Sequence, residues 1–220
     1  MKLYGSLTSP YVRKARVLIK EKNLPVELVV EDPWEEDSPI TRRNPLGKVP
    51  VLEVAPGRCL FESVFVLHYL DHFDGNPLQP KDAAGYWQSQ WWQALGNGII
   101  DAVVHRVLET RRLPRNQMPE VMTREEQRMR RAIDAAERAY RRGRFLVGRE
   151  FTLADLVMGV ALQYTDFRYP HDWHSRAPKL ARWHARVIHR KSFKETLPPG
   201  YEKLPRSTSK TAKLATDKHG

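Results

Sequence analysis

The sequence predicts two domains of different class, an α/β domain followed by an all-helical domain. Short strand-like apolar runs alternate with helical patterns over residues 1–76, whereas from residue 82 onward only helical periodicity remains. The 220 residues are enough for two such domains with hydrophobic cores. We therefore expect one domain over 1–76 and another over 82–200. A polar, basic tail over 201–220 has little to bury and is expected to be disordered.

The first domain begins with a predicted βαβ unit. The run "MKLYGS" is typical of a short strand, "PYVRKARVLIKEKN" of a helix with Val12, Ala15 and Ile19 on one face, and "VELVVE" of a second strand. The helix has the length of a crossover connection, so the two strands should lie parallel in one sheet.

A hairpin and a further helix complete this domain. The runs "VPVLEV" and "CLFE" are separated by the turn signal "APG", and the amphipathic run "SVFVLHYLDHF" follows and ends before Gly75. With a poorly defined helix in the acidic stretch before the hairpin, the order is β-α-β-α-β-β-α. That order is typical of a thioredoxin-like domain.

The helical domain is predicted from apolar spacing and two capping boxes. Residues at four-residue steps predict a buried stripe, and two glycines inside it predict a bend or a close helix contact. Thr123 with Glu126, and Thr152 with Asp155, are capping-box pairs that should begin two further helices, the second at the centre of the bundle. The stripe is Trp87, Trp91, Leu95, Ile99 and Val103, the glycines are Gly96 and Gly98, and the tryptophans at 87, 91 and 92 are interpreted as core and domain interface. Inward positions are expected at Met129, Ile133, Ala136 and Tyr140, at Leu156, Val160 and Tyr164, and at Leu180, Trp183 and Val187.

The charge and the cysteine content restrict the partners. The formal net charge is +11, and residues 106–149 hold thirteen arginines against six acidic residues. No nucleic-acid motif or interleaved aromatic residue accompanies them, so we interpret this stretch as a solvated face and expect no nucleic-acid partner. Cys59 is the single cysteine, which excludes internal disulfides and cysteine-rich metal sites, and its strand position indicates a small buried hydrophobe. No leader or membrane-length apolar run is present, so we expect a cytoplasmic protein without a membrane partner.

The stretch "TSPYVRK", residues 8–14, is the first candidate site. Ser9 precedes Pro10, as a helix N-cap precedes a proline at the first helical position. The same geometry brings a hydroxyl, free backbone N–H groups and the positive end of a helix dipole to one point, which suits an anion such as a thiolate. Thr8 offers a second hydroxyl one position earlier.

Two further motifs follow in the same domain, "NPLGKVPVL" at residues 44–52 and "FES" at residues 61–63. Taken with "TSPYVRK" and the helical second domain, their order and spacing resemble the glutathione transferase family. The resemblance extends to about residue 200 and is strongest to bacterial members with a catalytic serine.

The resemblance implies a binding site for glutathione as co-substrate, with no metal. It implies a cis peptide before Pro50, and pairing of the Val49 backbone with the cysteinyl part of glutathione as an added strand. Ser63 would hold the α-carboxylate of the γ-glutamyl end, although an N-cap serine is the alternative, and Glu62 would accept its ammonium group. Lys48 would reach the glycyl carboxylate or remain a solvated loop lysine.

The implied chemistry is activation of a thiol. A free thiol is mostly protonated at neutral pH, and a hydrogen bond from Ser9 would lower its pKa, so Ser9 would act as a donor and not as a nucleophile. The expected reaction is addition of the thiolate to a small hydrophobic electrophile held near His105, Tyr164 and Arg168, by a detoxification enzyme that is a homodimer. The alternatives are an ether-cleaving, isomerising or peroxide-reducing enzyme of the same fold, or a non-catalytic adaptor that binds protein or nucleic acid.

Overall fold

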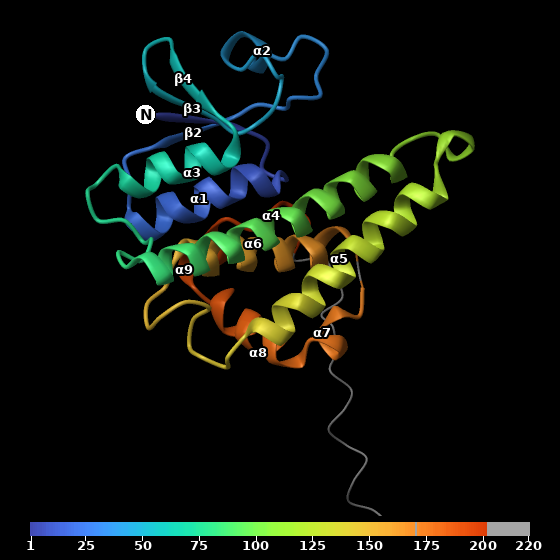
Figure 1. Ribbon diagram of the computed structural model, residues 1–220. Coiled ribbons are helices and arrows are strands. Elements are labelled where there is room, and N and C mark those ends of the chain that lie inside the picture. Colours follow the sequence, from blue (N-terminus) through green and yellow to red (C-terminus); the bar gives the residue numbers. More distant parts are fainter. Residues whose placement is uncertain (170, 202–220) are drawn as a thin grey trace, which may run out of the picture.

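A four-stranded mixed sheet forms the core of the N-terminal half. The computed structural model describes residues 1–169 and 171–201 (Figure 1). The strands are β1 (Lys2–Gly5), β2 (Glu27–Val30), β3 (Val51–Ala55) and β4 (Arg58–Phe61), in the spatial order β2-β1-β3-β4. β1 and β2 pair parallel, whereas β3 pairs antiparallel with β1 and with β4. The predicted βαβ unit, the hairpin and the thioredoxin-like class are confirmed.

The helices of this half are α1 (Pro10–Lys22), the short α2 (Ile40–Arg43) and α3 (Ser63–His72). α1 is buried on more of its surface than its apolar face predicts, because Arg13 and Lys14 are also buried. The reason is its position: α1 packs against α3 of its own half and against α6 and α9 of the helical half. α1 is therefore the main element between the two halves.

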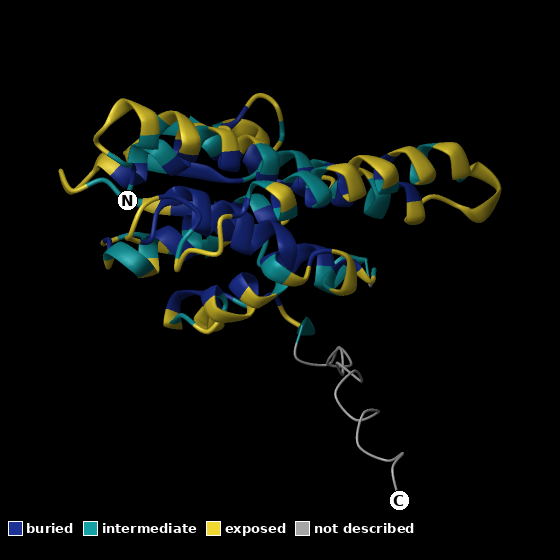
Figure 2. Cartoon of the chain, turned by 60° about the horizontal axis from the view of Figure 1, so that its bottom comes forward, coloured by how far each residue is buried: buried dark blue, intermediate teal, exposed yellow. Residues whose placement is uncertain are grey.

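The helical half is built on two long antiparallel helices and one central helix (Figure 1). Its elements are α4 (Ala83–Thr110), the 3-10 turn η1 (Pro114–Asn116), α5 (Pro119–Ala139), α6 (Leu153–Arg168), α7 (Trp173–Arg176), α8 (Pro178–Val187) and α9 (Lys191–Glu195). α6 is buried from residue 153 to residue 165, whereas the far ends of α4 and α5 project into solvent (Figure 2). The predicted central helix is confirmed, and so are the predicted inward positions of α5, α6 and α8.

The buried carboxylate of Asp155 stabilises the start of α6 through hydrogen bonds. It accepts hydrogen bonds from the backbone N–H of Leu146 at 2.8 Å and of Thr152 at 3.0 Å, and from Trp183 Nε1 at 3.3 Å. The predicted capping box of Thr152 and Asp155 is thus present. The expected close helix contact is present at Gly96, where an added Cβ would lie 2.9 Å from Cγ1 of Val157 on α6.

The predicted burial of the first α4 tryptophans is wrong. Trp87 is 69 % exposed and Trp91 45 %, whereas Trp92 is buried. Four-residue steps overshoot one helical turn, so a stripe at that spacing rotates by about 40° per step around the helix. The stripe therefore starts on the solvent side at Trp87 and reaches the core only at Ile99 and Val103.

The predicted capping box at Thr123 and Glu126 is also wrong. α5 begins one turn earlier, at Pro119, so Thr123 lies inside the helix. Tertiary contact sets this start, because the carboxylate of Glu109 on α4 accepts the backbone N–H of Met118 at 2.7 Å. The capping group comes from another helix, and the local start signal, Pro119 at the first helical position, is not part of the predicted capping box.

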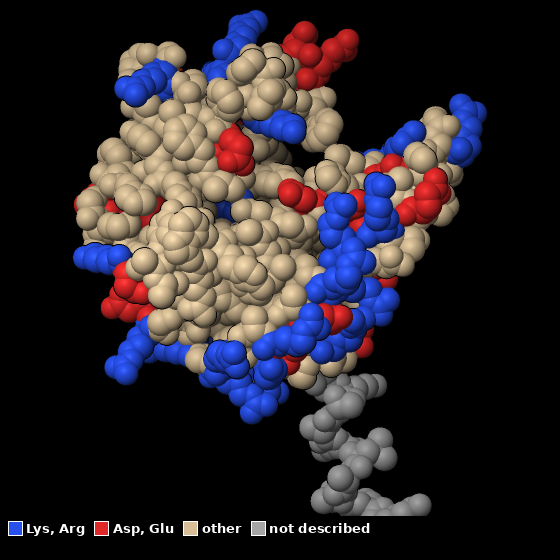
Figure 3. Space-filling view, viewed as in Figure 1, with Lys and Arg blue, Asp and Glu red and all other residues tan. Residues whose placement is uncertain are grey.

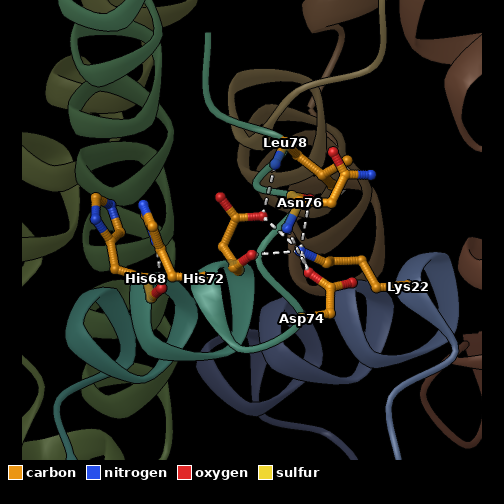
Figure 4. Close-up of polar contacts among 7 residues, drawn as sticks. Lys22, His68, His72, Asp74, Asn76 and Leu78 are labelled. Carbon is orange, nitrogen blue, oxygen red and sulfur yellow. Dashed lines mark hydrogen bonds and ion pairs between the residues drawn. The ribbon is translucent and has the colours of Figure 1, made fainter. Parts of the chain in front are cut away.

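Lys22 holds the connection between the two halves in place (Figure 4). Its Nζ lies 2.7 Å from Asp74 Oδ1, 2.9 Å from the carbonyl oxygen of Asn76 and near the Asp71 carbonyl oxygen. Asp71, on α3, accepts the backbone N–H of Leu78 at 2.9 Å. The last residue described is Tyr201, whose ring centroid lies 5.9 Å from that of Phe167, and the rest of the predicted tail lies outside the described residues.

Candidate active site

A cleft of about 490 Å³ lies between the two halves. Its N-terminal wall consists of the loop before α1, the first residues of α1, the segment 44–50 and the start of α3, and its helical wall consists of α4 and α6. Every residue that the sequence analysis singled out for chemistry, apart from Cys59, lines this cleft: Ser9, Lys48, Val49, Pro50, Glu62, Ser63, His105, Tyr164 and Arg168. Residues far apart in the sequence are thus brought to one place.

Ser9 is the N-cap of α1, as its sequence context predicts. Its backbone is extended, and its Oγ accepts the backbone N–H of Val12 at 3.3 Å. Accepting this bond leaves the Ser9 hydroxyl hydrogen available for a donor role. The hydroxyl of Thr8 also lines the cleft, but its Oγ1 lies 3.2 Å from Oγ of Ser6, so it already has a hydroxyl partner.

Glu62, and not Ser63, caps α3. The Glu62 carboxylate accepts the backbone N–H groups of Val64 at 3.1 Å and Phe65 at 3.2 Å. Glu62 also has φ 74°, a conformation that costs a residue with a side chain on the order of 1–3 kcal/mol. The strained residue lies on the cleft wall directly before Ser63, and its carboxylate occupies the N–H groups of Val64 and Phe65.

Lys14 lies beneath Ser63 and was not predicted as a site residue. Its side chain is fully buried, and its Nζ donates to Oγ of Ser63 at 3.0 Å and to Oδ1 of Asn97 at 2.6 Å. Burial lowers the pKa of Lys14 to about 8, which nearby Glu62 and Asp101 oppose. The wall behind Ser63 therefore holds a cation. Nothing in the helical run "VRKARV" around Lys14 predicts that its side chain is buried.

A hydrogen bond joins the two walls at the base of the cleft. The hydroxyl of Tyr11, on α1, donates to Oδ1 of Asp101, on α4, at 2.5 Å. Burial raises the pKa of Tyr11, and the bond to Asp101 adds to that effect. Tyr11 therefore stays protonated and links the first turn of α1 to the helical half.

The segment 44–50 forms the next part of the N-terminal wall. The Val49–Pro50 peptide bond is cis, as predicted. Asn44 is buried and holds the loop, because its side-chain amide donates to the Lys48 carbonyl at 2.7 Å and accepts the backbone N–H of Leu46 at 3.0 Å. The Lys48 side chain is exposed at the edge of the cleft.

The helical wall combines apolar and basic side chains. Val104, Val107 and Leu108 of α4 line it, together with Tyr164 and other residues. The side chain of His105 is 55 % exposed, which places it at the rim, and Arg168 closes the α6 end. Tyr164 is buried, and burial raises the pKa of its hydroxyl against the opposing charges of Arg168 and Arg111.

Cys59 lies outside this cleft on β4 and is only half-buried, more exposed than expected. Burial raises the pKa of its thiol, so the thiolate is disfavoured at neutral pH. This agrees with the interpretation of Cys59 as an unreactive residue.

Comparison with known proteins identifies the family. Residues 3–77 match the glutathione S-transferase N-terminal domain, and residues 119–186 match the glutathione S-transferase C-terminal domain. The chain is 33 % identical over 201 residues to the uncharacterized GST-like protein YibF of Escherichia coli, covering 90 % of this chain and 99 % of that protein. The chain belongs to the glutathione S-transferase family.

Two solved structures extend this likeness. A glutathione S-transferase from Methylobacterium radiotolerans in complex with glutathione sulfonate has a TM-score of 0.85 and 34 % identity, covering 90 % of this chain and 94 % of that chain. One from Methylobacillus flagellatus with glutathione bound has a TM-score of 0.85 and 36 % identity, covering 90 % and 98 %. This member of the glutathione S-transferase family thus shares its fold with proteins that hold glutathione or a derivative. In the described part of the chain, no helix is both long and apolar enough to cross a membrane.

Proposed function

We propose that this protein is a glutathione transferase that activates bound glutathione for addition to small hydrophobic electrophiles. The observation that carries the proposal is Ser9, an N-cap hydroxyl in the cleft whose oxygen already accepts a bond and whose hydrogen is free to donate. The related structures with glutathione or glutathione sulfonate bound support glutathione as the co-substrate.

In this proposal each part of the N-terminal wall holds one part of glutathione. Ser63 binds the γ-glutamyl carboxylate, Glu62 accepts its ammonium group, and the Val49 backbone pairs with the cysteinyl part. Lys48 attracts the glycyl carboxylate. Ser9 then donates to the thiolate at the positive end of α1, which lowers the thiol pKa and raises the fraction of the nucleophile at neutral pH.

The test is glutathione binding together with turnover of an uncharged aryl halide, 1-chloro-2,4-dinitrobenzene. We expect saturable binding by calorimetry and formation of the glutathione conjugate above the uncatalysed rate. Binding without turnover of this probe would favour a specialised enzyme of the same fold. Absence of binding would contradict the proposal and favour a non-catalytic adaptor.

We also propose that the protein is a homodimer. Phe65 on α3 and Trp87 and Trp91 on α4 are large, apolar and between 45 % and 69 % exposed, which is typical of a surface that another protein covers. Figure 3 shows a largely uncharged area over α3 and the first half of α4, whereas Lys and Arg gather over α5 and α8. Light scattering should give twice the mass of one chain, and Trp91→Glu should shift the mass toward the monomer. A monomeric wild-type protein would contradict this part.

We further propose two domains and a cytoplasmic location. The domain boundaries 1–76 and 82–200 and the cytoplasmic location follow from the family resemblance and the sequence. Limited proteolysis that leaves a fragment ending near residue 200 would support the outer boundary, and cleavage first within 77–81 would support the inner one.

A further inference from the structure

Two arginines line the cleft where α4 and α6 end. Arg111 follows the last residue of α4, Arg168 is the last residue of α6, and both line the cleft. Neither guanidinium lies within 4.0 Å of a carboxylate of residues 1–169 or 171–201, whereas the adjacent Arg112 pairs with Glu109 at 3.4 Å. Two unneutralised guanidinium groups therefore face one end of the cleft.

Arg168 packs against the ring of its neighbour Phe167. Its guanidinium carbon lies 4.1 Å from the centroid of the Phe167 ring, and its Nε is buried without a hydrogen-bond partner in the described part of the chain. Because Nε is buried, it is not the atom that a ligand would contact. Arg168 nevertheless lines the cleft, so its positive charge lies beside a bound ligand.

Tyr164 lines the same cleft as the two arginines. The positive charges of Arg168 and Arg111 oppose the rise in pKa that burial causes for its hydroxyl. Tyr164 is buried in the wall between the apolar α4 side chains and this basic end. An O–H group and two guanidinium groups are donors suited to a carboxylate.

The acidic group at this end of the helical wall already has a partner. Asp101 lines the base of the cleft, and its Oδ1 accepts the Tyr11 hydroxyl at 2.5 Å. Glu109, next along α4, pairs with Arg112 and accepts the Met118 backbone N–H. The Tyr11 hydroxyl is neutral, so Asp101 keeps its negative charge at the base of the cleft, and the positive charge is concentrated where Arg111 and Arg168 line it.

From these contacts we infer that the preferred electrophiles carry an anionic group, a carboxylate or a sulfonate, at the end of the molecule remote from the reacting carbon. This inference rests on the proposed function, since the electrophile reacts with glutathione held on the opposite wall. The apolar residues Val104, Val107 and Leu108 contact the body of the electrophile. Its anionic group binds to Arg111, Arg168 and Tyr164. The arginines select the substrate and do not contact the reacting atoms.

The direct test uses two product analogues of the same shape. S-(4-carboxybenzyl)glutathione and S-(4-carbamoylbenzyl)glutathione differ only in that one carries a negative charge at the far end. We expect calorimetry to give an affinity about tenfold higher for the carboxylate, because a hydrogen bond to a charged group is the stronger one. Raising the salt concentration should reduce the ratio.

Variants assign the preference to its residues. Arg168→Met should bring the ratio of the two affinities close to one, Arg111→Met should reduce it in part, and both should leave the affinity for glutathione itself unchanged. Arg106→Met is the matched control: Arg106 is on α4 but stacks on Tyr169 at 3.7 Å, outside the cleft lining. This control should retain the wild-type ratio.

Turnover gives an independent readout. With 4-chloro-3-nitrobenzoate and 4-chloro-3-nitrobenzamide, the glutathione sulfur bonds to the ring carbon, chloride leaves with its electron pair and the thiol proton passes to solvent. After subtraction of the uncatalysed rates, we expect a lower KM for the benzoate, and Arg168→Met should remove that difference.

The outcomes separate the two proposals. Equal affinity of wild-type protein for the two conjugates, with glutathione bound normally, would overturn the inference and leave the proposed function intact. No binding of glutathione or of either conjugate would overturn the proposed function, and the inference with it. A preference for the carboxylate that survives both arginine substitutions would contradict the assignment to this end of the cleft.

Discussion

The two walls of the cleft bind by different means. The N-terminal wall presents helix N-termini, backbone and small hydroxyls: Ser9 caps α1, Glu62 caps α3, and a cis peptide bond precedes Pro50. The helical wall presents side chains from two helices, with apolar residues of α4 beside Tyr164 and Arg168 of α6. A substitution replaces the side chain of a residue but usually leaves its backbone N–H and C=O groups in place.

This difference has a functional consequence. A wall made of caps and backbone suits a ligand that never changes, which is the role proposed for glutathione. A wall made of side chains can be altered one residue at a time, which suits the variable electrophile. Substitutions on the N-terminal wall should therefore affect every substrate, and those on the helical wall should affect some substrates only.

The largest expected effect is that of Ser9→Ala. Removing the donor to the thiolate should lower kcat/KM by about 100-fold, the usual cost of losing one donor to a developing or full anion, for every electrophile. Steady-state rates with 1-chloro-2,4-dinitrobenzene measure it, and Thr8→Ala is the matched control with an expected loss of less than about fivefold. A greater loss in Thr8→Ala would transfer the activating role to Thr8.

Lys14→Met should produce the next largest effect. Because Lys14 donates to Ser63 from a fully buried position, its charge is expected to strengthen carboxylate binding at Ser63, and the affinity for glutathione should fall by about tenfold. The free energy of unfolding at pH 7 should not fall, because the variant no longer buries a charge. Calorimetry and urea unfolding measure the two quantities. Lower stability with unchanged affinity would show a purely structural role.

Titration of Lys14 gives a pH dependence of known sign. Burial lowers its pKa to about 8, so the protonated form that attracts a carboxylate is lost as the pH rises above that value. The affinity for S-methylglutathione, which has no thiol to titrate, should fall between about pH 7 and pH 9 more steeply in the wild type than in Lys14→Met. Over the same range the wild-type folded state releases its proton before the unfolded chain does, so its stability relative to the variant should rise with pH. Parallel affinity curves would remove Lys14 from the site.

The smallest expected effect belongs to the helical wall. Tyr164→Phe removes one donor from the electrophile end and should raise the KM for 4-chloro-3-nitrobenzoate by about threefold, without affecting the KM for glutathione. The neutral benzamide is the control substrate and should be unaffected. An equal rise in the KM for glutathione and in the KM for the benzoate would contradict separate roles for the two walls.

Site residues whose surroundings are local in the sequence are easier to predict than those whose surroundings come from distant helices. Ser9, Pro50 and Glu62 lie in motifs of a few residues, since caps and turns are local structures that leave local signatures. Arg111 and Lys14 take their surroundings from helices distant in the sequence, so nothing next to them in the chain distinguishes them from surface residues. The error at Trp87 has a local cause, because a stripe at four-residue steps rotates around a long helix, whereas near Thr123 a contact with Glu109 of another helix helps to set the start of α5.

The central claim is that the Ser9 hydroxyl, at the N-cap of α1, stabilises the thiolate of bound glutathione. One measurement tests it directly. The ultraviolet absorbance of the thiolate in bound glutathione, recorded against pH, gives the thiol pKa on the protein. We expect a pKa at least about one unit below that of free glutathione in the wild-type protein and in Thr8→Ala, and a pKa close to the free value in Ser9→Ala. Bound glutathione with an unshifted thiol pKa in the wild-type protein would contradict the account and leave Ser9 as a helix cap only.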